Sequence, residues 1–136
     1  MAATVLAAIC CLFFMPFVPK IAFSHFTVSE QVRMDGSTFP VAVVKVQNTG
    51  FGPVWYNGSP DSVHDFSYYD DGELDNWNGQ HVKPVQWTRL AGGGETFVRV
   101  PIQDSGDRVR VAIRLFDWRG RSADCTSDRI SNPTGN

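Results

Sequence analysis

The chain has 136 residues and a formal net charge of −2 at pH 7, which argues against a nucleic-acid-binding protein, because such domains carry a net basic surface. The 112 residues that follow Ser24 are enough for a single domain with one hydrophobic core. This part of the chain retains one cysteine, Cys125, which excludes an intradomain disulfide. We expect its thiol to be a small buried apolar group.

The first 19 residues contain no charged side chain and predict an N-terminal hydrophobic helix. Two alternatives are open: a signal peptide, whose apolar core needs roughly 7 to 15 residues, and a membrane anchor, which needs about 20. Pro16 and Pro19 end the helix early, and residues 22–24 (Ala-Phe-Ser) place small residues where a signal peptidase reads them. We favour cleavage before His25 and keep retention as the alternative, in which residues 1–19 contact the membrane. In both cases the domain is expected to be extracytoplasmic: periplasmic, secreted or membrane-anchored.

The rest of the chain, residues 25–130, shows apolar residues that alternate with period two and end in turn residues, which predicts one β-domain. The expected strands are Phe26–Arg33, Val41–Gln47, Val54–Tyr56, Val63–Tyr69, Val85–Leu90, Thr96–Val100, Arg108–Phe116 and a short one near Thr126–Ile130. The expected inward-facing residues include Ala42, Val44, Val46, Val109, Val111, Ile113 and Leu115. Residues 131–136 are expected to form a disordered tail.

About seven short strands at regular spacing predict an all-β fold, an immunoglobulin-like antiparallel β-sandwich preceded by the N-terminal helix. A small barrel is the alternative. Because the cysteine pair of antibody domains is absent from the sequence, the immunoglobulin likeness concerns architecture alone.

Strand and turn signals between residues 41 and 121 resemble those of small exported bacterial proteins of unknown function. They comprise the strand 44–48 that enters an Asn-Thr-Gly turn, the Pro-Val-Trp-Tyr segment 53–56, the strand that ends in Val-Pro at 100–101, and the Arg-Val strand 108–115. This resemblance implies an exported β-sandwich and brings no catalytic residues. The acidic segment 70–80 has no counterpart in that pattern.

Aromatic residues are one candidate binding site, since exposed aromatic side chains can hold a sugar ring or a protein partner. Trp55, Tyr56 and Trp77 lie beside predicted turns and are the expected surface residues. Trp87 and Tyr68 lie within predicted strands, and we expect both in the core.

A row of arginines, Arg108, Arg110 and Arg114, is the second candidate, because guanidinium groups on one strand face can hold an anionic partner. Arg119 and Arg121 extend the row. The favoured alternative is a solvated face whose charge is balanced by nearby aspartates, namely Asp104, Asp107, Asp117 and Asp124.

Four carboxylates within six residues, Asp70, Asp71, Glu73 and Asp75, are a candidate calcium site, because calcium prefers several oxygen ligands. Their spacing fits no EF-hand loop, and a solvated acidic loop is the favoured alternative. Neighbouring loop carboxylates also do not show the separation across a cleft that a glycosidase pair requires.

The sequence contains no glycine-rich phosphate loop, no metal-spaced histidine pair and no nucleophile elbow. We therefore expect a non-catalytic binding module of the cell envelope that needs no cofactor and whose partner is a protein or a glycan at the cell surface. A passive structural domain without a ligand is the first alternative, and a carbohydrate-active enzyme is the second.

Overall fold

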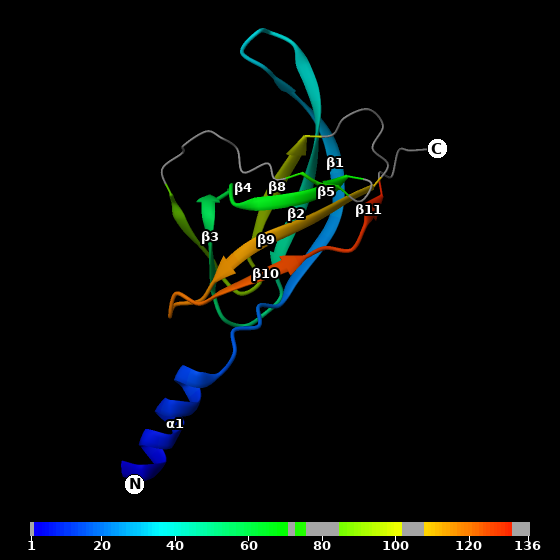
Figure 1. Cartoon of the computed structure of the whole chain (residues 1–136). Coiled ribbons are helices and arrows are strands. Elements are labelled where there is room, and N and C mark those ends of the chain that lie inside the picture. Colours follow the sequence, from blue (N-terminus) through cyan, green and yellow to red (C-terminus); the bar gives the residue numbers. More distant parts are fainter. Residues whose placement is uncertain (1, 71–72, 76–84, 102–107, 132–136) are drawn as a thin grey trace.

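The computed structural model describes residues 2–70, 73–75, 85–101 and 108–131. Its elements are α1 (Ala2–Phe14), β1 (Ile21–Val32), β2 (Thr38–Asn48), β3 (Val54–Ser59), β4 (Ser62–Val63), β5 (Phe66–Asp70), β6 (Glu73–Asp75), β7 (Trp87–Leu90), β8 (Glu95–Pro101), β9 (Arg108–Phe116), β10 (Ser122–Thr126) and β11 (Ile130–Ser131). One N-terminal helix followed by strands confirms the all-β prediction (Figure 1).

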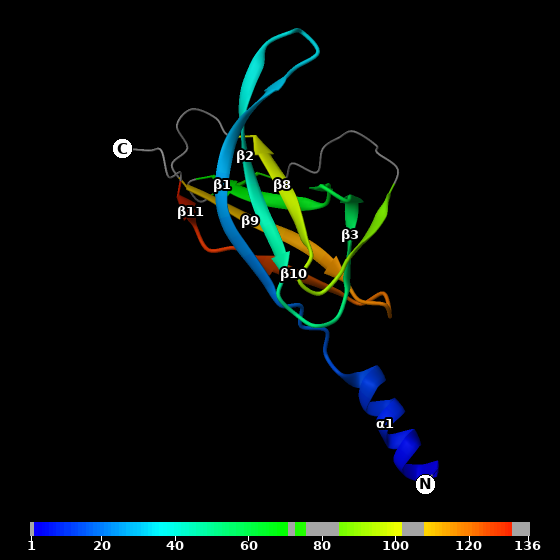
Figure 2. The ribbon, with the colours of Figure 1, turned by 180° about the vertical axis from the view of Figure 1, so that it is seen from behind.

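All described strand pairs are antiparallel, and they form two sheets. The smaller sheet has three strands in the order β1-β2-β8. The larger has eight: β4-β3-β9-β5-β6 form a path, β7 pairs with β3, and β10 and β11 pair with β9. The two sheets face each other in both views of the ribbon (Figures 1 and 2), which is the arrangement of a β-sandwich.

Side chains from both sheets fill one core. The smaller sheet contributes Ala42, Val44, Val46, Val98 and Val100, and the larger contributes Val54, Tyr56, Val109, Val111, Ile113 and Leu115, among others. All seven residues expected to face inward are in this core, because alternation from Ala42 onward in β2 and along β9 assigns every second side chain to one face. Each buried valine or leucine contributes roughly 1.5–3 kcal/mol of transfer free energy.

The β-domain starts at Ile21, four residues before the expected boundary at His25. Ile21 pairs with Asn48 and Phe23 with Val46, and both apolar side chains pack against the core. Cleavage before His25 would therefore remove the first four residues of β1 together with their pairing to β2. At their other ends, β1 and β2 extend as a hairpin beyond the sandwich (Figure 1).

The C-terminal strands differ from the prediction. A strand near residues 126–130 was expected, whereas the structure forms β10 at Ser122–Thr126 and the short β11 after an interruption. Ser127 makes that interruption: its backbone N–H donates to the Val111 carbonyl at 2.8 Å, and its hydroxyl accepts from the Val111 N–H at 2.9 Å. The side chain thus replaces a backbone acceptor of the ladder, which a periodicity argument does not anticipate.

The buried amide of Asn48 joins two turns at the end of the sandwich nearest α1. Its Nδ2 donates to the carbonyls of Gly52 at 2.9 Å and Leu90 at 3.2 Å, while its Oδ1 accepts from the Gly50 N–H at 3.0 Å. The backbone of Asn48 also bonds with Gly93 and Gly94. The predicted Asn-Thr-Gly turn is therefore fastened to the β7–β8 turn by a fully paired polar side chain.

Candidate functional site

Three aromatic side chains lie on the outer face of the larger sheet, and we call them the aromatic face: Trp55 of β3, Trp87 of β7 and Phe116 of β9. Trp55 pairs directly with Phe116. The Trp87 ring reaches across β3 to the Phe116 ring, with centroids 4.6 Å apart at an interplanar angle of 79°. Such an edge-to-face pair holds both rings in a fixed orientation.

Polar groups surround the aromatic face. Arg89 is paired with Trp55 across the ladder, and Arg114 precedes Phe116 by two residues and so lies on the same face. Asn57 is paired with Trp87, and its Oδ1 accepts from the Gln86 N–H at 3.0 Å. The arrangement offers an open apolar surface with hydrogen-bonding groups at its edge, which suits contact with a sugar ring or a protein.

Two sequence-based placements are wrong, and both concern this sheet. Trp87, expected in the core, is 54% exposed, and Tyr56, expected at the surface, is 1% exposed. The reason is the alternation along β3 and β7: Val54, Tyr56 and Gly58 face the core, and so does Leu90, which leaves Trp55 and Trp87 outside. The Tyr56 hydroxyl donates to the Ser59 carbonyl at 2.8 Å, and burial raises the pKa of Tyr56.

The other aromatic residues have different outcomes. Tyr68 is buried, which confirms its predicted place in the core. Trp55 is half-buried on the outer face, where a partner can reach it. Trp77 lies outside the described residues.

The arginine row lies partly as expected. Arg110 and Arg114 are exposed on β9. The structure describes the backbone of Arg108 but not its side chain. Arg114 forms a two-point ion pair with Asp124, with Nε–Oδ1 at 2.8 Å and Nη2–Oδ2 at 3.2 Å. The hydrogen bond from Arg114 lowers the pKa of the Asp124 carboxyl. Arg110 donates from Nε to the Ser127 carbonyl at 3.2 Å, so both described arginines have partners within the chain.

The side chains of the acidic candidates are not among those that the structure describes. Asp70, Glu73 and Asp75 contribute backbone to the β5–β6 hairpin, and all of Asp71 lies outside the described residues. Among the residues that are described, no group of three or more His, Cys, Asp or Glu side chains is placed to hold a metal ion. The calcium site stays a prediction.

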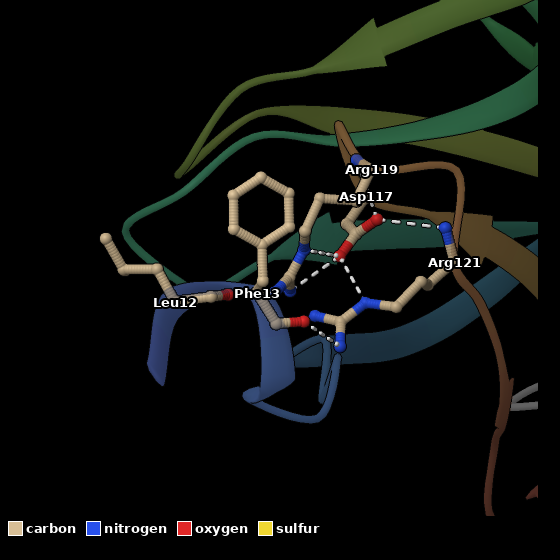
Figure 3. Close-up of polar contacts among 5 residues, drawn as sticks. All are labelled: Leu12, Phe13, Asp117, Arg119 and Arg121. Carbon is tan, nitrogen blue, oxygen red and sulfur yellow. Dashed lines mark hydrogen bonds and ion pairs between the residues drawn. The ribbon is translucent and has the colours of Figure 1, made fainter. Parts of the chain in front are cut away.

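A second polar cluster occupies the turn between β9 and β10, residues 117–121, which we call the Asp117 turn (Figure 3). The buried Asp117 carboxylate accepts through Oδ1 from the backbone N–H groups of Arg119 at 2.9 Å and Arg121 at 3.0 Å. Through Oδ2 it accepts from Arg119 Nε at 2.8 Å and Arg121 Nε at 3.1 Å, and the same oxygen forms an ion pair with Arg119 Nη2 at 2.7 Å. Four hydrogen bonds and an ion-pair contact on one carboxylate fix the conformation of the whole turn.

The same two arginines contact the last turn of α1. Arg119 donates from Nη1 to the Leu12 carbonyl, and Arg121 donates from Nη1 to the Phe13 carbonyl at 3.5 Å (Figure 3). The Phe13 ring lies edge-on to Trp118, with centroids 6.1 Å apart. The carbonyls at a helix C-terminus have no partner within the helix, and cations stabilise that end. The sequence did not reveal this contact, because Leu12 and Arg119 are 107 positions apart.

A scan against known family models finds no match for this chain, and a search of curated proteins finds none either. The resemblance to small exported bacterial proteins therefore stays a prediction. Within the described part of the chain, no helix is long and apolar enough to cross a membrane.

Cys125 is expected to react slowly with thiol reagents while the chain is folded. It is half-buried on β10 against the core, and burial raises the pKa of its thiol, with a further contribution from the charge of Asp124. Because the thiolate is the reacting form, modification by a maleimide at pH 7 should be about tenfold slower in the native chain than in concentrated urea. Peptide mapping of the alkylated protein measures this ratio. Equal rates in the two states would contradict the placement of Cys125.

Proposed function

We propose that the chain is an exported or membrane-anchored, non-catalytic binding module of the cell envelope, built as an immunoglobulin-like sandwich. Two facing antiparallel sheets support the architecture. The uncharged 13-residue helix α1 supports export, because its length is that of a signal-peptide core. An extracytoplasmic location follows from the same feature.

The aromatic face carries this proposal. Two tryptophans and a phenylalanine on one outer sheet face are unusual where no core requires them, and aromatic rings are frequent anchors of binding surfaces. Trp87 is the central element, since it is both exposed and held in place by Phe116. The flat rings with Arg89 at their side suit a glycan of the cell surface, whose C–H faces stack on aromatic rings and whose hydroxyl or carboxylate groups accept from guanidinium.

The test is a titration of the full chain in mild detergent with soluble peptidoglycan fragments and anionic polysaccharides, read by tryptophan fluorescence and calorimetry. Trp87→Ala should weaken glycan binding by about tenfold or more, which is about 1.4 kcal/mol. Trp118→Ala is the matched control, because Trp118 is also an exposed tryptophan, at 67%, but lies in the Asp117 turn against Phe13 of α1. It should bind like the unmodified chain.

Losing the edge-to-face pair with Phe116 should also lower the stability of Trp87→Ala by about 1 kcal/mol, so its folding is verified by circular dichroism. Equal weakening in both variants would contradict a site on the aromatic face. The passive structural alternative predicts no binding and no ligand-dependent change in stability. A protein partner would instead be captured from envelope extracts by the unmodified chain and lost with Trp87→Ala.

A further inference from the structure

Four segments meet at the end of the sandwich from which α1 projects, and we call this the helix end. They are the linker 15–20, the β2–β3 turn 49–53, the β7–β8 turn 91–94 and the Asp117 turn (Figures 1 and 2). Hydrogen bonds join them: the Thr49 N–H donates to the Lys20 carbonyl at 2.8 Å, and the Gly93 N–H to the Asn48 carbonyl at 2.7 Å. Arg119 and Arg121 hold the last turn of α1 to the same end.

Large apolar side chains are exposed at the helix end. Phe51, at the tip of the β2–β3 turn, is 106% exposed, and Trp118 is also exposed beside Phe13. The exposed apolar residues of α1 and its linker continue this surface: Val5, Leu6, Ile9, Leu12, Phe13, Phe14, Met15 and Val18. Many exposed large apolar side chains at one end of a molecule mark a contact with another phase or molecule.

The charge of the helix end is positive. The four segments contain three basic residues, Lys20, Arg119 and Arg121, and one acid, Asp117. Lys20 is exposed. This charge complements an anionic surface, and basic residues beside an apolar helix are attracted to anionic lipid headgroups.

The pattern of α1 favours lipid over a protein groove. Its bulky apolar residues at positions 5, 6, 9, 12 and 13 lie on one side of the helix, and the opposite side carries alanine, cysteine, Phe14 and a single threonine, so α1 has no charged or strongly polar face. A helix that docks into a protein groove presents one apolar stripe and one polar face, whereas a helix that is apolar all round suits a hydrocarbon environment.

We propose that the helix end is a lipid-facing surface: α1 enters the acyl region of an anionic bilayer, Phe51 and Trp118 lie at its interface, and the exposed Lys20 lies near the headgroup phosphates. The proposal rests on the membrane-anchored form of the function proposed above. Arg119 and Arg121 of the Asp117 turn hold the last turn of α1 in place. The helix, Phe51 and Trp118 therefore approach the bilayer from the same side of the domain. Aromatic side chains are enriched at this depth of membranes.

Two tryptophan substitutions at fully exposed positions test this. Phe51→Trp places a tryptophan at the helix end, and Met34→Trp places one at the tip of the β1–β2 hairpin, where Met34 is 107% exposed at the far end of the molecule (Figure 1). Neither position packs in the core, so both variants should fold. Each full-length variant is reconstituted into phosphatidylcholine–phosphatidylglycerol vesicles with and without brominated acyl chains, which quench only nearby tryptophans.

The fluorescence that Phe51→Trp adds to that of the unmodified chain should fall about twofold or more in brominated vesicles, and the fluorescence that Met34→Trp adds should not. Trp118→Phe should remove most of the quenching seen with the unmodified chain, and Trp87→Phe should leave it. Equal quenching of the two added tryptophans would overturn the proposal, and so would the absence of quenching of both. Absence of quenching is the result expected if α1 inserts alone or binds a protein. Because these fluorescence measurements do not involve a glycan, a negative result would contradict the lipid contact of the helix end without bearing on glycan binding at the aromatic face.

Discussion

Gly58→Ala is expected to lower the free energy of unfolding by about 3–4 kcal/mol, one of the largest effects available in this chain. Gly58 lies in β3 between two neighbours, pairing with Val63 of β4 and donating its N–H to the Gln86 carbonyl at 2.8 Å. Its carbonyl accepts from the Thr88 hydroxyl. A Cβ at this position would lie 2.1 Å from the Ser62 carbonyl oxygen and 3.0 Å from the Val63 Cα. Because both contacts are backbone atoms, relief requires that β3 and β4 move apart.

Thermal and urea unfolding of the full chain in mild detergent measure this loss. Gly52→Ala is the matched control, since a Cβ there meets nothing within 4 Å. It should change the free energy of unfolding by less than about 0.5 kcal/mol. Similar effects of the two substitutions would show that β3 and β4 do not approach each other as closely as the structure has them.

Asp117→Ala is expected to lower the free energy of unfolding by about 3 kcal/mol. The substitution removes the acceptor of four hydrogen bonds and leaves the Arg119 and Arg121 guanidinium groups, both partly buried, without their counter-charge. It should also loosen the end of α1, because the arginines that donate to the Leu12 and Phe13 carbonyls lose their fixed geometry. Limited proteolysis of the linker 15–20 should accelerate accordingly.

Two variants separate the causes of this effect. Asp124→Ala removes an exposed carboxylate that is paired with Arg114, and it should lower the free energy of unfolding by less than about 0.5 kcal/mol, because solvent screens exposed pairs. Asp117→Asn retains an acceptor oxygen for the backbone N–H groups of the turn. Its loss in free energy of unfolding should lie between those of Asp117→Ala and Asp124→Ala. If Asp117→Ala were as mild as Asp124→Ala, burial would not be what makes the Asp117 turn stabilising.

The sequence predicted the parts of the fold that depend on local pattern. The alternation of Val109, Val111, Ile113 and Leu115 was sufficient to assign the inner face of β9, because one set of positions is uniformly apolar and the other is largely charged. The uncharged N-terminus likewise predicted α1. Turn residues predicted the reversal after Asn48, although not the buried amide that ties this turn to the Leu90 carbonyl.

Hydrophobic alternation could not assign the inward face of a strand where both faces carry residues that could be buried. Trp55 and Tyr56 are adjacent aromatic residues, so alternation alone states that one faces inward without deciding which. The pairing of β3 with β7 and β9 decides it, and the same pairing places Trp87 outside beside Phe116. The aromatic face therefore could not be assembled from the sequence, although Trp55 was one of its predicted members.

By itself, the sequence determined an apolar N-terminal helix, a β-rich domain with one core, and strands whose inner positions repeat every second residue. The tertiary structure decided which aromatic rings share the outer face, and it decided that Arg119 and Arg121 reach the carbonyls of a helix more than a hundred positions away. The physical reason is range. Backbone propensity and hydrophobic alternation act between near neighbours, whereas sheet pairing and the satisfaction of helix-end carbonyls depend on which distant segments the closed core brings together.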